Sequence, residues 1–551
     1  MGSKTKCLLL LSLIWLFMFS FINNGYLYTS LKDHFEISQT NQISIKSSGS
    51  WNLINISIFI DDSDPNFNWS KTANENDWCS GTGTWIDPYT IENLTIISQN
   101  PGNCIEIRNS NAPFIIQNST INLETSDGAC IRLDNVDNGK VINNNCSGNT
   151  DNGIRLDSSN NITILGNNIS GITYQGIRLS YSHNNKIIGN YVKECAEGFY
   201  LSSSNHNVIS NNTLNNNTCG IEISFSQNNT LTKNNFTENN SAIHLGHNYD
   251  ITLSENLMNF CGITLYGLLA ELLSLNIYDN NLVNNKPVYY YTNKKDLGPS
   301  NFTDAGQIIL INCSESIISG VNISSSTTGI YLGYSNNTIL SNNNVNNNRF
   351  CGIHIYSSEN NLVSEINAYN NIHGILLEKV NNHLVSEVNV YNNSFGINVG
   401  ESNTINLFGN TVYNNSDGVA LIHSDNITVM GNSFSYNEVG IYLDFGTQNS
   451  KIFLNSFTQN YDNAYDYGIN NQWDNGTIGN YWDNYKGVDA NNDGIGDTPY
   501  TILGTAGSQD NFPIWDDGDQ AGIPRISFGN YYIMFTILSL FLIILKKKKE
   551  L

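Results

Sequence analysis

Apolar and polar residues alternate along most of this chain in short runs that recur at a fixed interval. A Gly-Ile-x-Leu unit, in which x is usually polar, starts at Gly153, Gly176 and Gly198, and later copies follow at steps of 22 or 23 residues almost everywhere. Those copies begin at Gly220, Ala242, Gly262, Gly329, Gly352, Gly374, Gly396, Gly418 and Gly440, and Cys104 and Cys130 extend the series upstream. The interval of 67 residues between Gly262 and Gly329 spans about three steps, and Gln307 falls on one of them.

A second signal keeps the same period: an apolar pair followed by a polar residue and Asn or Glu, as in 164–167, 187–190 and 362–365. Two or three short alternating segments per period, each ended by Gly, Asn or Ser, predict β-strands and turns. No sustained helical stripe interrupts them, and the apolar run 268–275 stays on the repeat grid. The period is too short for helical repeats and lacks the leucine-rich consensus, so each repeat predicts one coil of a parallel β-helix, about sixteen coils in all.

The composition supports this all-β fold class. The chain contains about 95 asparagines, far above ordinary usage. Turn asparagines of successive coils can bond to one another in a ladder, and Asn tolerates the left-handed backbone of tight turns. The apolar residues of each Gly-Ile-x-Leu unit should point inward and the x residue outward.

Both ends of the chain predict export and membrane anchoring. Lys4 and Lys6 precede an apolar run, which is typical of a signal, and a second apolar stretch precedes the lysines 546–549. The expected organisation is a signal peptide or signal anchor at 1–29, an N-terminal cap at 30–75, the β-helix at 76–460, a C-terminal cap at 461–520, a transmembrane helix at 526–545 and a cytoplasmic tail at 546–551. The body would then be extracellular at the cell membrane, and its Asn-x-Ser/Thr sequons permit glycosylation.

The net charge of the chain limits the classes of molecule that it can bind. The chain has 25 Lys+Arg against 48 Asp+Glu, a formal net charge of -23, which disfavours binding to nucleic acid.

Three local segments resemble a known family. They are the opening segment 81–93, the central segments 285–291 and 306–313, and the closing segments 479–485 and 510–513. They resemble right-handed β-helix proteins of the NosD-like type, in an archaeal surface form, within the wider carbohydrate-binding and sugar-hydrolase β-helix group. The resemblance implies a right-handed parallel β-helix. The family name also implies copper, which nine His and five Met without a His-x-His or Met-rich cluster do not support.

The outward column of the repeated strand supplies the candidate ligand-binding residues. In coil order these are Arg132, Arg155, Arg178, Tyr200, Glu222 and His244, with Asp134 and Asp157 two positions further along their strands. One interpretation is an interleaved salt-bridge ladder, in which each pair contributes little. The other is a groove for a polysaccharide, with arginines for carboxylates or hydroxyls and Tyr200 as a stacking platform.

The sharpest chemical motif is the loop 489–497. Its oxygen ligands stand at Asp489, Asn491, Asp493 and Asp497, with Ile495 offering a carbonyl and Gly494 at the turn, as in a calcium loop. Tyr500 stands where an EF-hand has a bidentate Glu, and the alternative is an acidic turn.

These observations favour a membrane-anchored, extracellular, non-catalytic β-helix that binds glycans or other surface components. Two alternatives stay open: a polysaccharide lyase or glycoside hydrolase acting on acidic polysaccharide, for which Glu222 and His244 are the nearest candidates, and a structural surface-layer component. Hydrolysis would need two carboxylates about 5–10 Å apart. No cofactor other than calcium is expected.

Overall fold

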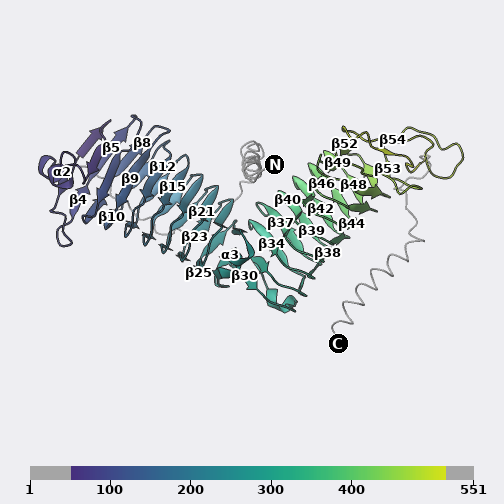
Figure 1. Cartoon of the computed structure of the whole chain (residues 1–551), viewed down its shortest axis with the longest axis horizontal. Coiled ribbons are helices and arrows are strands. Elements are labelled where there is room, and N and C mark those ends of the chain that lie inside the picture. Colours follow the sequence, from purple (N-terminus) through teal and green to yellow (C-terminus); the bar gives the residue numbers. More distant parts are fainter. Residues whose placement is uncertain (1–50, 517–551) are drawn as a thin grey trace, which may run out of the picture. The chain divides into compact units, whose positions relative to one another are not determined.

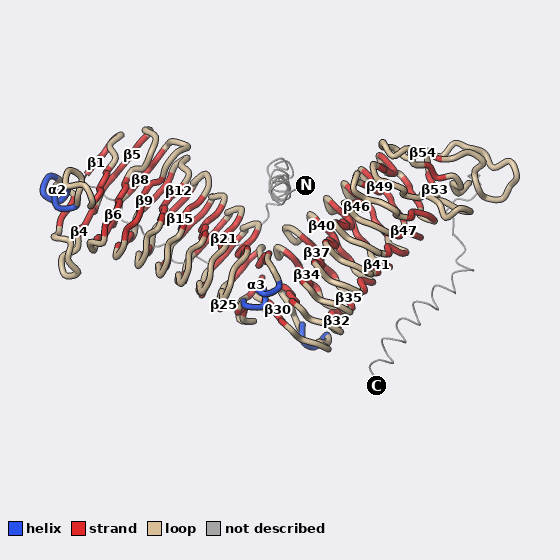
Figure 2. Tube along the Cα trace, viewed as in Figure 1, coloured by secondary structure: helices blue, strands red, loops and turns tan. Residues whose placement is uncertain are grey.

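The computed structural model describes residues 51–516, and within them the chain forms a right-handed parallel β-solenoid of about 18 turns. Strands of successive coils lie side by side and are joined by short loops (Figures 1 and 2). The prediction of about sixteen coils was too low. The first and last coils contain β2 (Ile58–Asp61) and β52 (Asp462–Asp466), whose sequences lack the Gly-Ile-x-Leu unit.

Three sheets form the N-terminal solenoid, and all their pairings are parallel except the β3–β4 pair. Sheet N1 contains β2, β6 (Ile105–Ser110), β9 (Ala129–Val136), β12 (Asn152–Asp157), β15 (Gln175–Ser180), β18 (Glu197–Ser202), β21 (Cys219–Ser224), β24 (Ser241–Gly246) and β27 (Ile263–Tyr266). Sheet N2 contains β3 (Cys79–Ser80), β4 (Tyr89–Glu92), β7 (Phe114–Gln117), β10 (Gly139–Ile142), β13 (Thr163–Leu165), β16 (Lys186–Ile188), β19 (Val208–Ser210), β22 (Thr230–Thr232), β25 (Thr252–Ser254) and β28 (Asn276–Ile277). Sheet N3 contains β1 (Trp51–Ile54), β5 (Leu94–Ser98), β8 (Thr120–Leu123), β11 (Asn145–Ser147), β14 (Asn168–Ser170), β17 (Tyr191–Lys193), β20 (Thr213–Asn215), β23 (Asn235–Thr237), β26 (Leu257–Asn259) and β29 (Leu282–Val283).

Three parallel sheets form the C-terminal solenoid. Sheet C1 contains β30 (Lys286–Thr292), β31 (Gln307–Ile311), β34 (Thr328–Gly333), β37 (Cys351–Tyr356), β40 (His373–Glu378), β43 (Phe395–Gly400), β46 (Asp417–Ile422), β49 (Val439–Leu443) and β52. Sheet C2 contains β32 (Ile317–Ser319), β35 (Ile339–Ser341), β38 (Leu362–Ser364), β41 (Leu384–Ser386), β44 (Asn406–Phe408), β47 (Thr428–Met430) and β50 (Lys451–Phe453). Sheet C3 contains β33 (Asn322–Ser324), β36 (Asn344–Asn346), β39 (Asn367–Tyr369), β42 (Asn389–Tyr391), β45 (Thr411–Tyr413), β48 (Ser433–Ser435), β51 (Ser456–Thr458) and β53 (Tyr481–Trp482). A small antiparallel pair, β54 (Tyr500–Thr501) with β55 (Gln509–Asp510), lies in the C-terminal cap.

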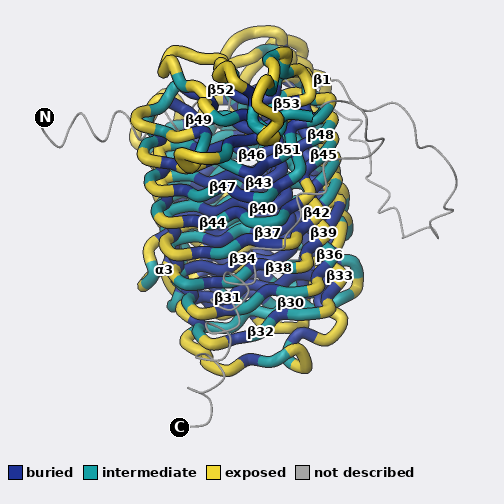
Figure 3. Tube along the Cα trace, turned by 90° about the vertical axis from the view of Figure 1, so that its right-hand side faces the viewer, coloured by how far each residue is buried: buried dark blue, intermediate teal, exposed yellow. Residues whose placement is uncertain are grey.

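The apolar residues of the repeat form the core, as predicted. Ile177 and Ile353 are fully buried, and each aligns with an apolar residue in the coils before and after it. Figure 3 shows buried positions along the strands of the C-terminal solenoid and exposed ones at its turns.

A ladder of buried asparagines joins the turns, which confirms the structural role inferred for Asn. In each rung the side-chain oxygen accepts from the preceding coil and the amide nitrogen donates onward; Asn190 Oδ1 accepts from the Asn167 backbone at 2.9 Å, and Asn190 Nδ2 donates to Asn212 at 3.0 Å. The ladder of the N-terminal solenoid runs through Asn144, Asn167, Asn190, Asn212, Asn234, Asn256 and Asn281. A matching ladder in the C-terminal solenoid runs through Asn410, Asn432, Asn455 and Asn480 and ends on the carboxylate of Asp510.

The run 268–275 departs from the repeat, which corrects the expectation that it stays on the grid. It contains helix α3 (Leu269–Ser274). Strand β28 follows and still pairs parallel with β25, but the two strands after it, β29 and β30, pair antiparallel. This hairpin joins sheet N3 to sheet C1. At the start of this helix, Glu271 accepts from the backbone N–H of Leu268 at 2.7 Å, as the acidic residue of a capping box does. Two further short helices are α2 (Trp69–Glu75) and η1 (Pro299–Phe302).

Strand β31 separates two hydrophobic cores. Its Ile309 and Ile311 belong to the core of the N-terminal solenoid, whereas Ile308 and Leu310 belong to that of the C-terminal solenoid. Gln307 begins the strand and is fully buried; its side chain accepts from Ile263 N at 2.9 Å and donates to Ile263 O at 2.7 Å. A side-chain amide therefore closes the edge of β27, where another strand would otherwise pair.

Between residues 51 and 516, none of the helices has the length and apolar character needed to cross a bilayer. The predicted signal segment 1–29, the transmembrane helix 526–545 and the tail 546–551 lie outside the described residues.

Candidate functional site

The outward column of sheet N1 is assembled as the sequence indicates. Arg132, Arg155 and Arg178 occupy the same register position on β9, β12 and β15. Tyr200, Glu222 and His244 continue the column on β18, β21 and β24. The parallel pairing places each side chain about 4.8 Å from the next, so the column is one continuous polar surface.

Its first part is an ion-pair ladder. Arg132 lies 3.1 Å from Asp134, 3.1 Å from Asp157 and 3.4 Å from Glu106. Arg155 lies 2.8 Å from the same Asp157 carboxylate. The salt-bridge interpretation therefore accounts for these two arginines and for both aspartates.

Arg178 differs from the two arginines beneath it. Among the described residues it forms no ion pair within 4 Å, and its Nε is buried without a hydrogen-bond partner. Burying a guanidinium donor without a partner is costly, and such groups require an explanation. Three residues that bear chemistry follow it on the next coils: Tyr200, Glu222 and His244.

Glu197 joins this part of the column and was not a candidate from the sequence. It begins β18 and accepts a hydrogen bond from Gln175 at 2.8 Å. Burial raises the pKa of Glu197, and the nearby Glu222 raises it further. Burial also raises the pKa of Glu222 and lowers that of His244. The hydrogen bond from Gln175 and the guanidinium of Arg178 act in the opposite direction on the pKa of Glu197, because both favour its charged form.

Sheet C1 carries a different outward column. Leu376, Asn398 and Ala420 are buried, although they point away from the core of the C-terminal solenoid. Tyr331, in the same column, belongs to the core of the N-terminal solenoid. On the neighbouring column, Phe395 stacks on the imidazole of His373 at 4.9 Å between ring centres, and Phe350 meets it edge-on at 5.3 Å. Aromatic side chains therefore cover much of this face.

Two histidines, His354 and His373, contact these aromatic side chains. His354 lies 3.4 Å from the carboxylate of Glu378. Burial lowers the pKa of His373 to about 3.

The loop 489–497 turns as the calcium motif requires. Gly494 has φ of +83°. The Asp489 carboxylate accepts from Gly494 N at 2.8 Å, Asp493 accepts from Ile495 N at 2.9 Å, and Asp497 accepts from Ala490 N at 2.7 Å. Backbone amides thus hold these oxygens around one loop. No cluster of three or more His, Cys, Asp or Glu in residues 51–516 is placed to hold a metal, so calcium stays a prediction that rests on this spacing.

The nearby groups that could complete such a site are already engaged. Tyr500 stacks on Trp482 at 4.2 Å. Asp510 accepts from Trp482 Nε1 at 2.9 Å, and Asp483 accepts from Gln459 N at 2.6 Å.

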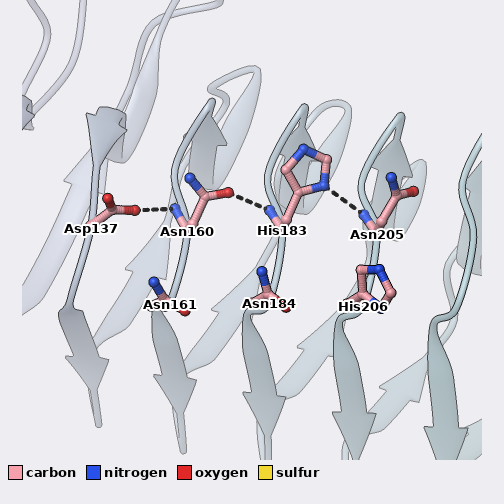
Figure 4. Close-up of a pocket in the computed structure, with 7 residues that line it drawn as sticks. All are labelled: Asp137, Asn160, Asn161, His183, Asn184, Asn205 and His206. Carbon is pink, nitrogen blue, oxygen red and sulfur yellow. Dashed lines mark hydrogen bonds between the residues drawn. The ribbon is translucent and has the colours of Figure 1, made fainter.

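A shallow depression on the turns after sheet N1 is lined by Asp137, Asn160, Asn161, His183, Asn184, Asn205 and His206. Figure 4 shows that its polar side chains bond from coil to coil. Asn160 Oδ1 accepts from His183 N at 2.8 Å, and His183 Nδ1 accepts from Asn205 N at 3.0 Å. In this arrangement His183 replaces an asparagine in a turn ladder.

Stacked coils, inward aliphatic rows and an asparagine ladder define a right-handed parallel β-helix. The family described as "Periplasmic copper-binding protein (NosD)" matches residues 115–298 and 293–487, and the chain belongs to this NosD family.

Solved β-helix structures also resemble the chain. The A-module of the mannuronan C-5 epimerase AlgE6 of Azotobacter vinelandii is 15% identical, with 71% of this chain and 90% of that chain covered and a TM-score of 0.25. An alginate lyase from Paenibacillus sp. is 11% identical, with 76% of this chain and 99% of that chain covered and a TM-score of 0.21. The DFA-IIIase of Arthrobacter chlorophenolicus A6 is 11% identical, with 59% of this chain and 72% of that chain covered and a TM-score of 0.30. No curated protein matches the chain.

The sulfur donors in the described residues do not fit copper. All nine cysteines there are buried, and burial raises the pKa of several thiols, Cys79 and Cys261 among them, to about 12. Thiolate ligands are therefore disfavoured. Met258 and Met430 are also buried, and His183 already uses Nδ1 as an acceptor.

Proposed function

We propose that this protein is a membrane-anchored, extracellular β-helix that binds a polysaccharide along sheet N1 without cleaving it. The observation that carries the proposal is Arg178, whose Nε is buried without a partner on a surface shared with Tyr200 and Glu222. That nitrogen is itself enclosed by protein, so an oxygen-rich ligand would bind the accessible part of the same guanidinium, which forms no ion pair with any described residue.

The chemistry of the surface suits a glycan. A guanidinium donates in a planar fork that fits a carboxylate or a pair of hydroxyls. Tyr200 offers an apolar ring with a hydroxyl. Glu197, Glu222 and His244 offer both donors and acceptors when they are uncharged.

The export and anchoring parts of the proposal rest on the sequence of the two ends. Lys4 and Lys6 with the following apolar run, and the apolar stretch before Lys546, favour a body held outside the membrane. Calcium bound at 489–497 would order the C-terminal cap in that environment.

Glycan binding by the full-length protein in lipid nanodiscs tests the function. We expect Arg178→Ala to reduce affinity at least tenfold. Arg155→Ala is the matched control: it removes the same group from the same column, but its ion pair with Asp157 already accounts for it, so affinity should change less than twofold. Equal losses in the two variants, or none in either, would contradict the assignment to Arg178.

A second function, cleavage of polysaccharide, is favoured by one observation. Glu197 and Glu222 lie on adjacent strands, and burial raises the pKa of each, as a general acid requires. Release of reducing or unsaturated ends by the wild type, abolished in Glu222→Gln, would establish this activity. Binding without such release supports the non-catalytic proposal.

A further inference from the structure

A second column runs beside the proposed glycan surface, at the turn that follows each strand of sheet N1. Its members are Ser158, Tyr181, Ser203, Phe225 and His247, with φ between +47° and +54°. The backbone N–H of Tyr181, Ser203 and Phe225 each donates to a carbonyl of the next coil at 3.1 Å. These bonds keep the column in register, with about 4.8 Å between neighbours.

Two of these positions hold aromatic side chains where they are least expected. Tyr181 is 64% exposed and Phe225 is 66% exposed. A left-handed backbone is unfavourable for bulky residues, and exposing a ring to water gains nothing for folding. The fold alone therefore gives no reason for either ring.

The orientation of Phe225 is set by the next coil. Its ring lies 5.2 Å from the imidazole of His247, with 10° between the planes. The Phe225 ring is therefore parallel to the imidazole on the next coil. One ring face rests on His247, and the opposite face is directed toward the coil of Ser203.

Ser203 is the residue at this position of the column between Tyr181 and Phe225. Its side chain is a single hydroxymethyl group, and Tyr181 stands on the coil beyond it. Tyr181 and Phe225 are two coils apart, about 9.6 Å. Half of that distance lies within the range over which rings stack, so one further ring fits between them.

We infer that the slot bounded by Tyr181, Ser203 and Phe225 holds one neutral pyranose ring of the glycan. This inference rests on the proposed function and extends it by naming the kind of sugar. The slot offers two exposed aromatic rings and a hydroxyl without a charged group of its own, which suits the C–H faces of a neutral hexose. Tyr200 lies three residues before Ser203, about 10 Å along the strand, so linked sugars can occupy the slot and the Arg178 surface together.

The test uses full-length protein in nanodiscs, titrated with cellohexaose as a neutral probe and with hexagalacturonate as an acidic one. We expect Phe225→Ala to weaken cellohexaose binding about tenfold, equivalent to about 1.4 kcal/mol. Ser203→Tyr should abolish the binding by filling the slot. Ser158→Tyr is the matched control, because it places the same ring at the same kind of turn one coil outside the slot, and it should change affinity less than twofold. Saturation transfer from aromatic protons to sugar ring C–H protons should vanish in Ser203→Tyr alone.

The outcomes separate the slot from the proposed function. Binding that depends on Arg178 but survives Ser203→Tyr unchanged would overturn the slot and leave the glycan function in place. Equal losses in Ser203→Tyr and Ser158→Tyr would also overturn it. Absence of binding of both hexasaccharides to the wild type would overturn the function and the slot together.

Discussion

Sheets N1 and C1 direct the same kinds of side chain inward and different kinds outward. Ile154 and Leu156 in β12, like Ile330 and Leu332 in β34, are fully buried. Outside, N1 presents arginine, glutamate and histidine in half-buried positions, whereas C1 presents buried side chains such as Leu376 and Ala420. The inward rows thus maintain the coil in both solenoids, and the outward rows are free to diverge. The proposed binding surface lies on N1 because its outward row is only half-buried.

The largest expected effect tests what the two solenoids share. Ile177→Asp and Ile353→Asp each place a charge in a fully buried row, and each should destabilise by about 4–5 kcal/mol or prevent folding. Thermal and denaturant unfolding would measure this. Arg178→Ala on the outward side of N1 should cost less than about 1 kcal/mol. Equal effects at inward and outward positions would refute the register of the coils.

The next effect concerns the boundary between the solenoids. Gln307→Ala leaves the Ile263 N–H and C=O without partners, which should cost about 2–4 kcal/mol. Hydrogen exchange at the Ile263 amide should accelerate. Gln448→Ala is the control, because that amide bonds to Asp425 in a half-buried position and should cost less than about 0.5 kcal/mol. Unchanged exchange at Ile263 would contradict the closing role of Gln307.

A third prediction concerns pH and the buried outward face of sheet C1. His373 is neutral in the folded state down to a pKa of about 3, whereas an unfolded histidine titrates near 6.5. Between these values the unfolded chain binds more protons, so the free energy of unfolding should fall as the pH drops through this window. From pH 6.5 to 5 we expect a loss of about 2 kcal/mol from this residue.

His373→Phe should remove that part of the pH dependence while keeping a ring against Phe395. The control is His206→Gln, which changes an exposed histidine of the N-terminal solenoid. A pH profile that is the same in the wild type and His373→Phe would contradict the burial of this imidazole.

The smallest effect concerns the C-terminal cap. Calcium at a few millimolar should stabilise the full-length protein by about 1 kcal/mol, and chelation should lower its Tm. Asp489→Ala with Asp493→Ala should abolish the response. Asp127→Ala with Asp250→Ala, two exposed carboxylates of the N-terminal solenoid, should not. A calcium response that persists without Asp489 and Asp493 would leave the loop as an acidic turn.

Sequence periodicity predicts the parts of this fold that repeat. The burial of Ile177 and the order of the column from Arg132 to His244 follow from a strict period, because equal spacing places equal positions on one face. Helix α3 was missed because the apolar run 268–275 lies at the spacing of the repeat, and the antiparallel turn between β29 and β30 follows that run. A period cannot show a change of strand direction.

The differences among chemically similar residues could not be predicted from the sequence. Arg132 and Arg178 share one column, yet only Arg132 meets three carboxylates, since that depends on side-chain conformations and on what the flanking positions carry. The cover over His373 likewise comes from Phe350 and Phe395 on neighbouring coils. Glu197 could have been found, because it precedes Gly198 at the same repeat position as Gln175, whose amide it binds.

The asparagine ladder has a direction. Every amide in it donates toward the following coil and accepts from the preceding one, so the bond dipoles add along the stack, as peptide dipoles do in a helix. At the last coil of a stack, the side-chain amide has no following asparagine to which it can donate. In the N-terminal solenoid, the last amide, that of Asn281, donates instead to the carbonyl of Tyr278. In the C-terminal solenoid, the last asparagine is Asn480, and it donates to the carboxylate of Asp510. A carboxylate accepts a hydrogen bond but has no N–H to donate to a further coil. Asp510 therefore marks the end of the stack of coils.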